Sequence, residues 1–363
     1  MAGKKARNNS NHKVRNTILI VLTIFFSAVI IVSASVVGVV YHYIGLIKWV
    51  DPNDTADNID PSMEDFDTDE ELGNMGDSVT DENGIAVTQP PEIHPDDVEW
   101  GDINNLTQFE DDGLINIMLV GQDRREGESR QRSDSMILVS VNPKTKGVSV
   151  ISFLRDTYVQ IPGNYSDNRL NVAYKFGGFK LLKETLKLNF GVTIDGCFEC
   201  DFNDFKEIID ILGGVEIDLT KKEASYMSDK LGKKISSGKR TLNGREALVY
   251  ARIRVIDSDF KRTERQRTIL MTLFKKFKNA GVMELKSIAD EILPKLATDM
   301  ESGQIASLMV EILPMVSSMD PKTYSVPFEG AYRNASIRKM SVLVPDLEVI
   351  RKKLANEYLP FER

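Results

Sequence analysis

A long apolar run near the N-terminus divides this chain into parts with different environments. Residues 17–47 contain no Asp, Glu, Lys or Arg. A helix needs about 20 apolar residues to cross a bilayer, so this run predicts a single transmembrane helix. Residues 1–16 are basic, which under the positive-inside rule predicts a cytoplasmic tail and an exported remainder. A cleaved signal peptide is the alternative, but its apolar core spans only about 7–15 residues.

An acidic stretch follows the apolar run. Residues 51–100 hold many Asp and Glu and neither Lys nor Arg. Low hydrophobicity with charge of one sign predicts disorder, so we assign 48–100 as an extracellular linker that lifts a domain, 101–363, off the membrane. A cation-binding or partner-binding tail is the alternative. The net charge of −8 belongs mainly to this stretch, so the domain itself is slightly basic.

Beyond residue 113, apolar residues recur with the period of a β-strand in some segments and with the period of an α-helix in others. Short β-rich runs alternate with amphipathic stretches of helical length, which predicts an α/β fold, namely a three-layer α-β-α domain around a central mixed sheet. The turn NPKTKG makes the second and third strands a hairpin. The predicted strands are 114–120, 135–141, 147–153, 197–202, 215–219 and 323–328. The predicted helices are 177–189, 204–212, 262–279, 284–293, 302–317 and 346–358.

Several classes of chemistry are excluded by the residues that the domain lacks. The three histidines are His12, His42 and His94, so none lies beyond residue 100. A Ser-His-Asp hydrolase is therefore excluded, and no nucleotide P-loop or zinc-protease motif occurs. Cys197 and Cys200 lack the partners of a zinc site and fall on opposite faces of a predicted strand. Carboxylates and arginines remain, and they suit phosphoryl transfer by positioning and charge.

Two carboxylates flank neighbouring strand ends. Asp123 follows the first strand and Asp134 immediately precedes the second, so both are expected at one rim of the sheet, where ligand sites of α/β folds lie. Two carboxylates together with substrate phosphates suit Mg²⁺, and Mn²⁺ is also compatible. Alternatively, both are turn residues that bind backbone N–H groups.

Arginines concentrate around the same predicted rim and in residues 251–267. Arg155 follows the third strand, and Arg252 and Arg254 would share a face in extended backbone. Arg262 and Gln266 lie near the start of a predicted helix, whose positive dipole end favours anions. The guanidinium group of arginine binds phosphate through two parallel hydrogen bonds. A solvated charge run is the alternative reading of this cluster.

A family resemblance is carried by these segments in order. The segments are NIMLVGQDRR, RQRSDSMILVSVNPKTKGVSVISFLRDTYVQIPG, RLNVAYKFGG, CDFNDFKEIIDILGGVEIDL, LNGREALVYARIR and DFKRTERQR. Together, over about residues 114–280, they resemble the LytR-CpsA-Psr family of bacterial wall-assembly enzymes, whereas 281–363 match loosely. The resemblance implies transfer of a glycopolymer from a polyprenyl-pyrophosphate carrier to peptidoglycan, leaving polyprenyl phosphate.

The resemblance also implies roles for individual residues. Asp123 and Asp134 would bind Mg²⁺ and, with Arg155 and Arg254, form the catalytic set; a carboxylate of the pair is the candidate general base. The residues implied to bind the pyrophosphate and head group are Arg132, Arg155, Arg169, Arg252, Arg254, Arg262 and Gln266. Arg169 stands where the family more often has Lys, which keeps the charge but changes the geometry.

The implied partners are a polyprenyl-pyrophosphate-linked glycan, a peptidoglycan acceptor and the cell membrane. An exported domain cannot reach DNA, so no nucleic acid is expected. Three alternatives stay open: a non-catalytic lipid-pyrophosphate binder, a membrane-anchored sensor, and a pyrophosphatase that releases glycan to water. The apolar stripes of helices 177–189 and 262–279 either line a groove for the isoprenoid tail or pack in the core.

Overall fold

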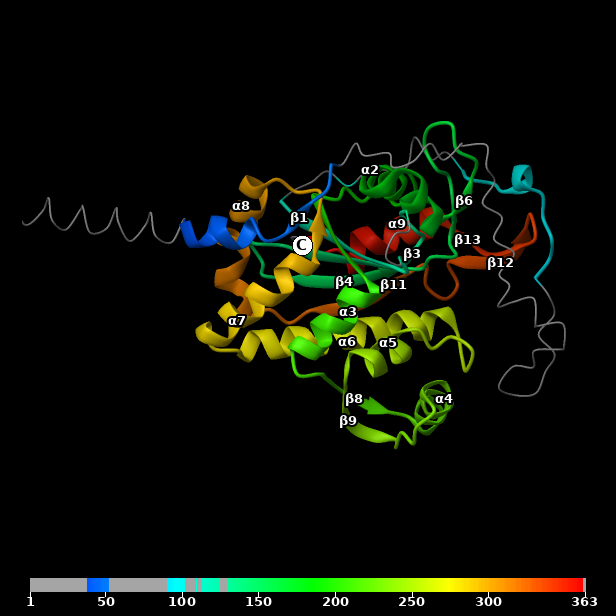
Figure 1. Cartoon of the computed structure of the whole chain (residues 1–363). Coiled ribbons are helices and arrows are strands. Elements are labelled where there is room, and N and C mark those ends of the chain that lie inside the picture. The colour runs from blue at the N-terminus through cyan, green and yellow to red at the C-terminus, as the bar shows by residue number, and fades with distance from the viewer. Residues whose placement is uncertain (1–37, 52–89, 102–108, 110–112, 125–128, 362–363) are drawn as a thin grey trace, which may run out of the picture.

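A seven-stranded mixed sheet forms the centre of the domain (Figure 1). The computed structural model describes residues 38–51, 90–101, 109, 113–124 and 129–361. The strand order is β1-β10-β7-β2-β3-β4-β11, with β3 antiparallel to β2 and β4. β7 and β11 run parallel to β2 and β4. The strands are β1 (Lys48–Trp49), β2 (Ile115–Gln122), β3 (Ser133–Val141), β4 (Val148–Phe153), β7 (Gly196–Asp201), β10 (Ala297–Thr298) and β11 (Lys322–Val326).

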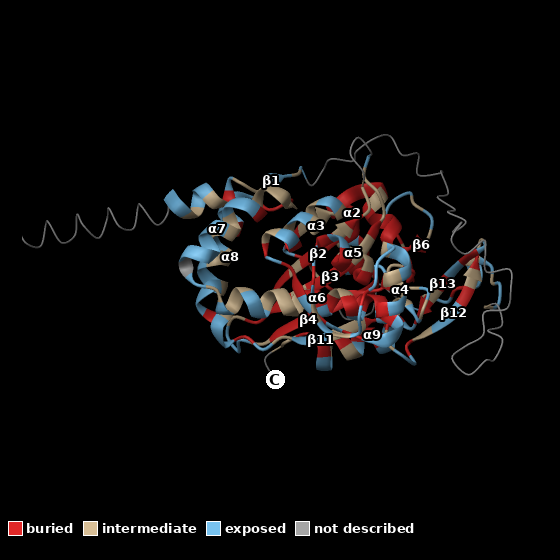
Figure 2. Cartoon of the chain, turned by 60° about the horizontal axis from the view of Figure 1, so that its bottom comes forward, coloured by how far each residue is buried: buried red, intermediate tan, exposed pale blue. Residues whose placement is uncertain are grey.

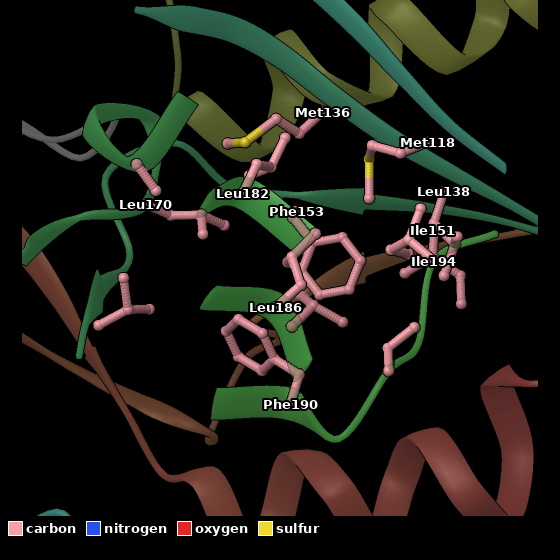
Figure 3. Packing of buried hydrophobic residues seen from close by; sticks show 14 of the residues in the cluster. Met118, Met136, Leu138, Ile151, Phe153, Leu170, Leu182, Leu186, Phe190 and Ile194 are labelled. Atoms are coloured by element: carbon pink, nitrogen blue, oxygen red, sulfur yellow. The ribbon is translucent and has the colours of Figure 1, made fainter. Parts of the chain in front are cut away.

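One face of the sheet packs on two helices, α2 (Leu170–Phe190) and α9 (Leu347–Lys353). Met118 and Met136 of the strands meet Leu182 and Leu186 of α2 in a cluster of buried side chains (Figure 3). All six residues of β4 are buried, because helices cover both faces of the sheet and leave no solvent side to this strand. Its apolar residues Val148, Val150, Ile151 and Phe153 and its small polar residues Ser149 and Ser152 are all compatible with that double coverage.

The opposite face packs on α6 (Asp259–Asn279) and the helices around it. Phe274 of α6 meets Ile115, Val141 and Val148 of the sheet. The neighbouring helices are α3 (Phe202–Ile211), α5 (Gly244–Ala251), α7 (Val282–Ile292) and α8 (Ser302–Ile312). With helices on both faces of a mixed sheet, the predicted α/β class is confirmed.

Three hairpins lie outside the central sheet, and the sequence pattern identified only the first strand of one of them. The hairpin β8 (Val215–Leu219) and β9 (Gly238–Leu242) packs with α4 (Lys221–Leu231) below α5 and α6. The other two are β5 (Tyr158–Val159) with β6 (Asn168–Arg169), and β12 (Tyr332–Ile337) with β13 (Met340–Pro345). Short strands that pair locally carry few residues of alternation, so their periodic signal is weak.

Several predicted helix boundaries were wrong. The helix predicted at 262–279 begins at Asp259, and those predicted at 302–317 and 346–358 end as α-helix at Ile312 and Lys353. Two other boundaries were wrong for identifiable reasons. The helix predicted from 177 begins at Leu170, because Gly177 and Gly178 form a kink inside α2 and not its start. Gly178 has φ of 59°, and a Cβ there would come within 2.8 Å of the guanidinium carbon of Arg130. α3 is capped by Asp201, whose side chain accepts hydrogen bonds from Asn203 N and Asp204 N, and not by Asn203.

The ends of the predicted linker contact the domain. Lys48–Trp49 pairs with β10, and the Trp100 ring stacks on Tyr158 with centroids 5.7 Å apart. Residues 1–37 and 52–89, which hold the predicted tail, most of the predicted span and most of the predicted linker, lie outside the described residues. Among the residues that are described, no helix has the length and apolar character needed to cross a membrane.

Candidate functional site

Three strand ends meet at one rim of the sheet and carry the predicted site. Because β3 is antiparallel to β2 and β4, its start lies beside their ends. Gly121 pairs with Ser135 and Gln122 with Ser133, so Asp134 is an extra residue without a partner on β2. Such a bulge re-aims side chains. As a result Asp134 and Ser135, although adjacent in sequence, both line the same cavity.

A cavity of about 1310 Å³ lies between the sheet and the helices α3, α5 and α6. Most of its wall is apolar, and most of its polar side chains are charged. The apolar lining includes Leu119, Ile137, Phe205, Ile208, Leu248, Ile269, Leu270 and Leu273. The polar lining includes Asp134, Arg155, Arg252, Arg254, Asp259, Arg262 and Gln266. The cavity therefore has the shape and chemistry for a ligand with a long apolar part and an anionic head.

Carboxylates hold the arginines of the cavity in an alternating network. Arg155 Nη1 donates to Asp134 Oδ1 at 2.5 Å, and its Nε lies 3.6 Å from Asp156 Oδ1. Arg254 Nη2 donates to Asp156 Oδ2 at 2.8 Å. These pairs fix the direction of the guanidinium groups before any ligand is present, which lowers the ordering cost of binding.

The two central carboxyl groups respond to this network in opposite directions. Burial opposes ionisation of Asp156, but the guanidinium groups around it, Arg155 foremost, hold its pKa below the ordinary value. Burial raises the pKa of Asp259, and the charge of Asp156 raises it further against the effect of Arg262. Asp156 is therefore the permanent anion that anchors the arginines, whereas Asp259 is the carboxyl group that gains a proton more readily.

The N-terminal part of α6 supplies the remaining contacts at the charged part of the cavity. The helix begins after the N-cap Ser258, whose side chain accepts a hydrogen bond from Lys261 N. Arg262 Nη2 lies 2.9 Å from Asp259 Oδ1. Gln266 Oε1 is buried without a hydrogen-bond partner. A helix N-terminus with an arginine and a free amide oxygen favours an anion that also carries a hydroxyl group.

Three of the predicted site residues do not line the cavity, namely Asp123, Arg132 and Arg169. Asp123 contacts Arg252, with Oδ2 and Nη2 3.5 Å apart, and Arg252 lies over the Phe202 ring at 4.7 Å. Arg169 is buried and its Nη1 lies 3.3 Å from Asp156 Oδ1. Arg132 directly precedes β3. In this structure Arg169 therefore neutralises a carboxylate behind the wall.

Two acidic residues of the site were missed by the sequence reasoning. Asp156 directly follows Arg155 and Asp259 lies three residues before Arg262 in the quoted segments, but neither was assigned a role. The signal was their spacing: Asp259 lies three residues before Arg262, which places both on one face of a helix. Arg265 lies in the same segment but does not line the cavity, because its guanidinium group pairs with Glu223 and with Asp257 of the cavity wall.

A divalent cation fits the donor set only together with a substrate. Within the described part of the chain, no group of three or more His, Cys, Asp and Glu side chains could hold a metal ion. Asp123 and Asp134 are hard oxygen donors, and each already contacts a guanidinium group. Mg²⁺ takes one or two carboxylates plus substrate phosphates and water, so two carboxylates suffice if a pyrophosphate supplies further oxygens.

The domain combines an α/β fold with a largely apolar cavity that also carries arginines, and sequence comparison identifies its family. A sequence model of the LytR_cpsA_psr family matches residues 80–356. The chain therefore belongs to the LytR_cpsA_psr family, and the resemblance found in the sequence is confirmed.

Individual relatives agree with this assignment. TagU of Bacillus licheniformis, named a polyisoprenyl-teichoic acid–peptidoglycan teichoic acid transferase, is 34% identical over 49% of this chain and 55% of TagU. The matched region thus spans about half of that relative. The regulatory protein MsrR of Staphylococcus aureus is 32% identical over 67% of this chain and 73% of MsrR. The crystal structure of TagV from B. subtilis, 27% identical, covers 69% of this chain and 99% of its own with a TM-score of 0.55.

Proposed function

We propose that this protein transfers a glycopolymer from a polyprenyl-pyrophosphate carrier to peptidoglycan at the outer face of the cell membrane. The observation that carries the proposal is the cavity, whose apolar wall continues directly into a set of arginines. An isoprenoid tail would fill the apolar part and a pyrophosphate would meet the arginines. The TagU relative is named for a transfer of this kind, with teichoic acid as the polymer and peptidoglycan as the acceptor.

The reaction needs a single displacement at phosphorus. An acceptor hydroxyl of peptidoglycan attacks the phosphate that bears the glycan, the bond to the bridging oxygen breaks, and polyprenyl phosphate leaves with the electron pair. The hydroxyl proton passes to a base, for which a carboxylate of the pair Asp123 and Asp134 is our candidate. Charge stabilisation by preorganised donors is the main contribution that a protein makes to such a step.

Each arginine has a distinct place in this step. Arg155 and Arg254 share Asp156 and face the same cavity, so they would hold neighbouring oxygens of the pyrophosphate. Arg262 and Gln266 lie along α6 and would bind the phosphate and sugar of the head group. Arg252, which is half exposed, would meet the part of the substrate nearest to solvent.

Asp123 and Asp134 would hold a Mg²⁺ or Mn²⁺ ion once the substrate is present. Bound there, the metal would neutralise the pyrophosphate and stabilise the leaving phosphate. Asp134 now accepts from Arg155, so binding of metal and substrate would free the Arg155 guanidinium for a phosphate oxygen. The apolar run 17–47 would anchor the chain with its N-terminus in the cytoplasm.

The test is transfer of a lipid-linked glycan to peptidoglycan oligomers by the purified full chain, followed by mass spectrometry of both products. Joint formation of polyprenyl phosphate and glycan-bearing peptidoglycan is the expected result. Tight lipid binding without either product would identify a binder or sensor. Release of free glycan phosphate would identify a pyrophosphatase.

A further inference from the structure

Exposed apolar side chains gather at one end of the molecule. Apart from Val255 and Val349, every large apolar side chain that is exposed in the described residues belongs to 38–51, α7, α8 or η3 (Leu313–Ser318). Met283 is 85% and Val310 75% exposed. Figures 1 and 2 place α7, α8 and the N-terminal helical segment together at this end. We call the surface formed by Tyr41, Trp49, Met283, Leu285, Val310 and Leu313 the apolar end face.

The last part of the apolar run is fixed to the same end. Residues 38–44 are helical, and Ile44 is buried against Met300 and Ile305. The Tyr43 side chain is a hydrogen-bond partner of Lys286 and Asp290 on α7. No flexible spacer therefore separates the end of the apolar run from the domain.

Backbone hydrogen bonds hold the next residues in the sheet. Lys48 N donates to Leu296 O at 2.9 Å, and Val50 N donates to Thr298 O at 2.8 Å. The segment around Ile47 is held on both sides, by α8 before it and by β10 after it. Its direction relative to the domain is therefore defined. The described part of the apolar run, residues 38–47, therefore lies at the apolar end face.

We infer that the apolar end face rests on the lipid bilayer, so that the domain is held against the membrane and not lifted off it. This inference depends on the proposed membrane anchor. The chain before Gly38 is apolar and uncharged back to residue 17. Tyr41 and Trp49 at its outer end are the side chains that membrane interfaces favour, and clustered exposed apolar side chains are typical of such a contact.

The orientation has a consequence for the cavity. α6 ends at Asn279, directly before α7, whereas Arg262 stands near its other end. With a rise of about 1.5 Å per residue, Arg262 and Leu273 lie roughly 16 Å apart along the helix. The apolar wall around Leu270 and Leu273 is thus on the membrane side of the arginines. A lipid tail would run along α6 from the bilayer to the charged part of the cavity.

Tryptophan scanning with lipid quenchers tests the inference on the full chain. The protein is reconstituted in phosphatidylglycerol vesicles that contain phosphatidylcholine brominated along its acyl chains. Val310→Trp is compared with Val349→Trp, because both valines are exposed and helical but Val349 lies on α9. We expect the brominated lipid to quench the fluorescence added by Val310→Trp at least about two-fold more than that added by Val349→Trp. Interfacial side chains reach about 5–10 Å into the headgroup and acyl boundary.

Each other outcome overturns the inference in a recognisable way. Equal quenching of the two variants, in protein that floats with the vesicles, would show that the domain stands away from the bilayer. Protection of Val310→Trp from acrylamide without lipid quenching would show that a second copy or another protein covers the face. Protein that does not float with the vesicles would show that the chain is not anchored, which would overturn this inference as well. If the two variants differ in quenching as expected but the protein transfers no glycan, only the proposed function would be overturned.

Discussion

Arg254 is the site residue whose replacement should change substrate binding with the least effect on folding. Its side chain is 33% exposed, against 17% for Arg155 and 6% for Arg262. Its partner Asp156 keeps Arg155 and Arg169 when Arg254 is removed. Loss of Arg155 would instead leave Asp134 without its guanidinium contact, and breaking a buried pair costs about 3–5 kcal/mol.

We expect Arg254→Ala to lower kcat/KM for glycan transfer by about 10–100-fold, because a charge-assisted hydrogen bond contributes about 1.5–3 kcal/mol. Arg254→Lys should recover only part of the loss, since the ammonium group cannot form the bidentate contact. Arg245→Ala, an exposed arginine on α5 outside the cavity, is the matched control. Wild-type turnover by Arg254→Ala would remove Arg254 from the mechanism.

Asp134 is the residue that tests the metal. Asp134→Asn keeps the shape and the acceptor for Arg155 but removes the charge that a divalent cation needs. We expect transfer by the wild-type protein to stop in EDTA and return with Mg²⁺, and Asp134→Asn to lose activity by at least about ten-fold and to need more Mg²⁺. The measurement is transfer rate against Mg²⁺ concentration, with the exposed Asp218→Asn on β8 as control.

Full activity in EDTA would show that the arginines act without a metal. An unchanged rate for Asp134→Asn would show that Asp134 serves as a bulge residue alone. The structure adds a further expectation: since Asp123 and Asp134 already contact guanidinium groups, Mg²⁺ should bind detectably only when a pyrophosphate is also present. Calorimetry with Mg²⁺ alone and with Mg²⁺ plus a short-chain prenyl pyrophosphate distinguishes the two cases.

At the scale of elements, α4 and α6 are joined by a buried ion pair. Glu223 closes the capping box of α4 with Thr220 and accepts from Arg265 Nε of α6 at 2.7 Å. Burial opposes ionisation of Glu223, but the hydrogen bonds from Arg265 and Thr220 lower its pKa below 4.5. The stability that it contributes is therefore present above pH 4.5 and is lost as the pH falls through the lower folded-state pKa.

We expect Glu223→Gln to reduce the free energy of unfolding by about 2 kcal/mol at neutral pH. The difference from wild type should shrink as the pH falls from 4.5 through the lower folded-state pKa, because Glu223 then becomes protonated and is neutral like glutamine. Urea unfolding followed by circular dichroism at several pH values measures this, with the exposed Glu216→Gln as control. A difference that stays constant with pH would assign the effect to packing.

The elements that could be predicted are those with a strong repeat. β2, β3, β4 and most of α6 carry long apolar periods, and their predicted positions agree with the structure within a few residues. Helix α4 was missed because most of its residues are polar. The hairpin β12–β13 was missed although β13 is apolar, and its buried side chains pack on the distant residues Val98 and Tyr158. Local periodicity reports one face of one element, and these elements are stabilised by neighbours that are remote in sequence.

At the scale of the whole molecule, residues before the predicted domain boundary stabilise the fold. Trp100 stacks on Tyr158, and its Nε1 donates to Asp167 Oδ2 at 3.1 Å. We expect Trp100→Ala to lower the free energy of unfolding by about 2 kcal/mol, roughly half of the cost at a fully buried site. Thermal unfolding measures this, and Trp100→Phe should retain most of the stability because it keeps the ring. A chain that starts at Gly101 and is as stable as one that starts at Pro90 would contradict this role.

The sequence by itself determined the family, the α/β class and the residue types of the site, because motifs, periodicity and charge are local properties. It also determined that Asp134, Arg155, Arg254 and Arg262 would be candidates for phosphate chemistry. Tertiary structure decided which of them share one cavity. A bulge turns Asp134 towards it, Asp156 gathers three arginines from three segments, and Arg169 stays behind the wall. Those outcomes depend on pairing between residues far apart in the chain, which no local pattern encodes.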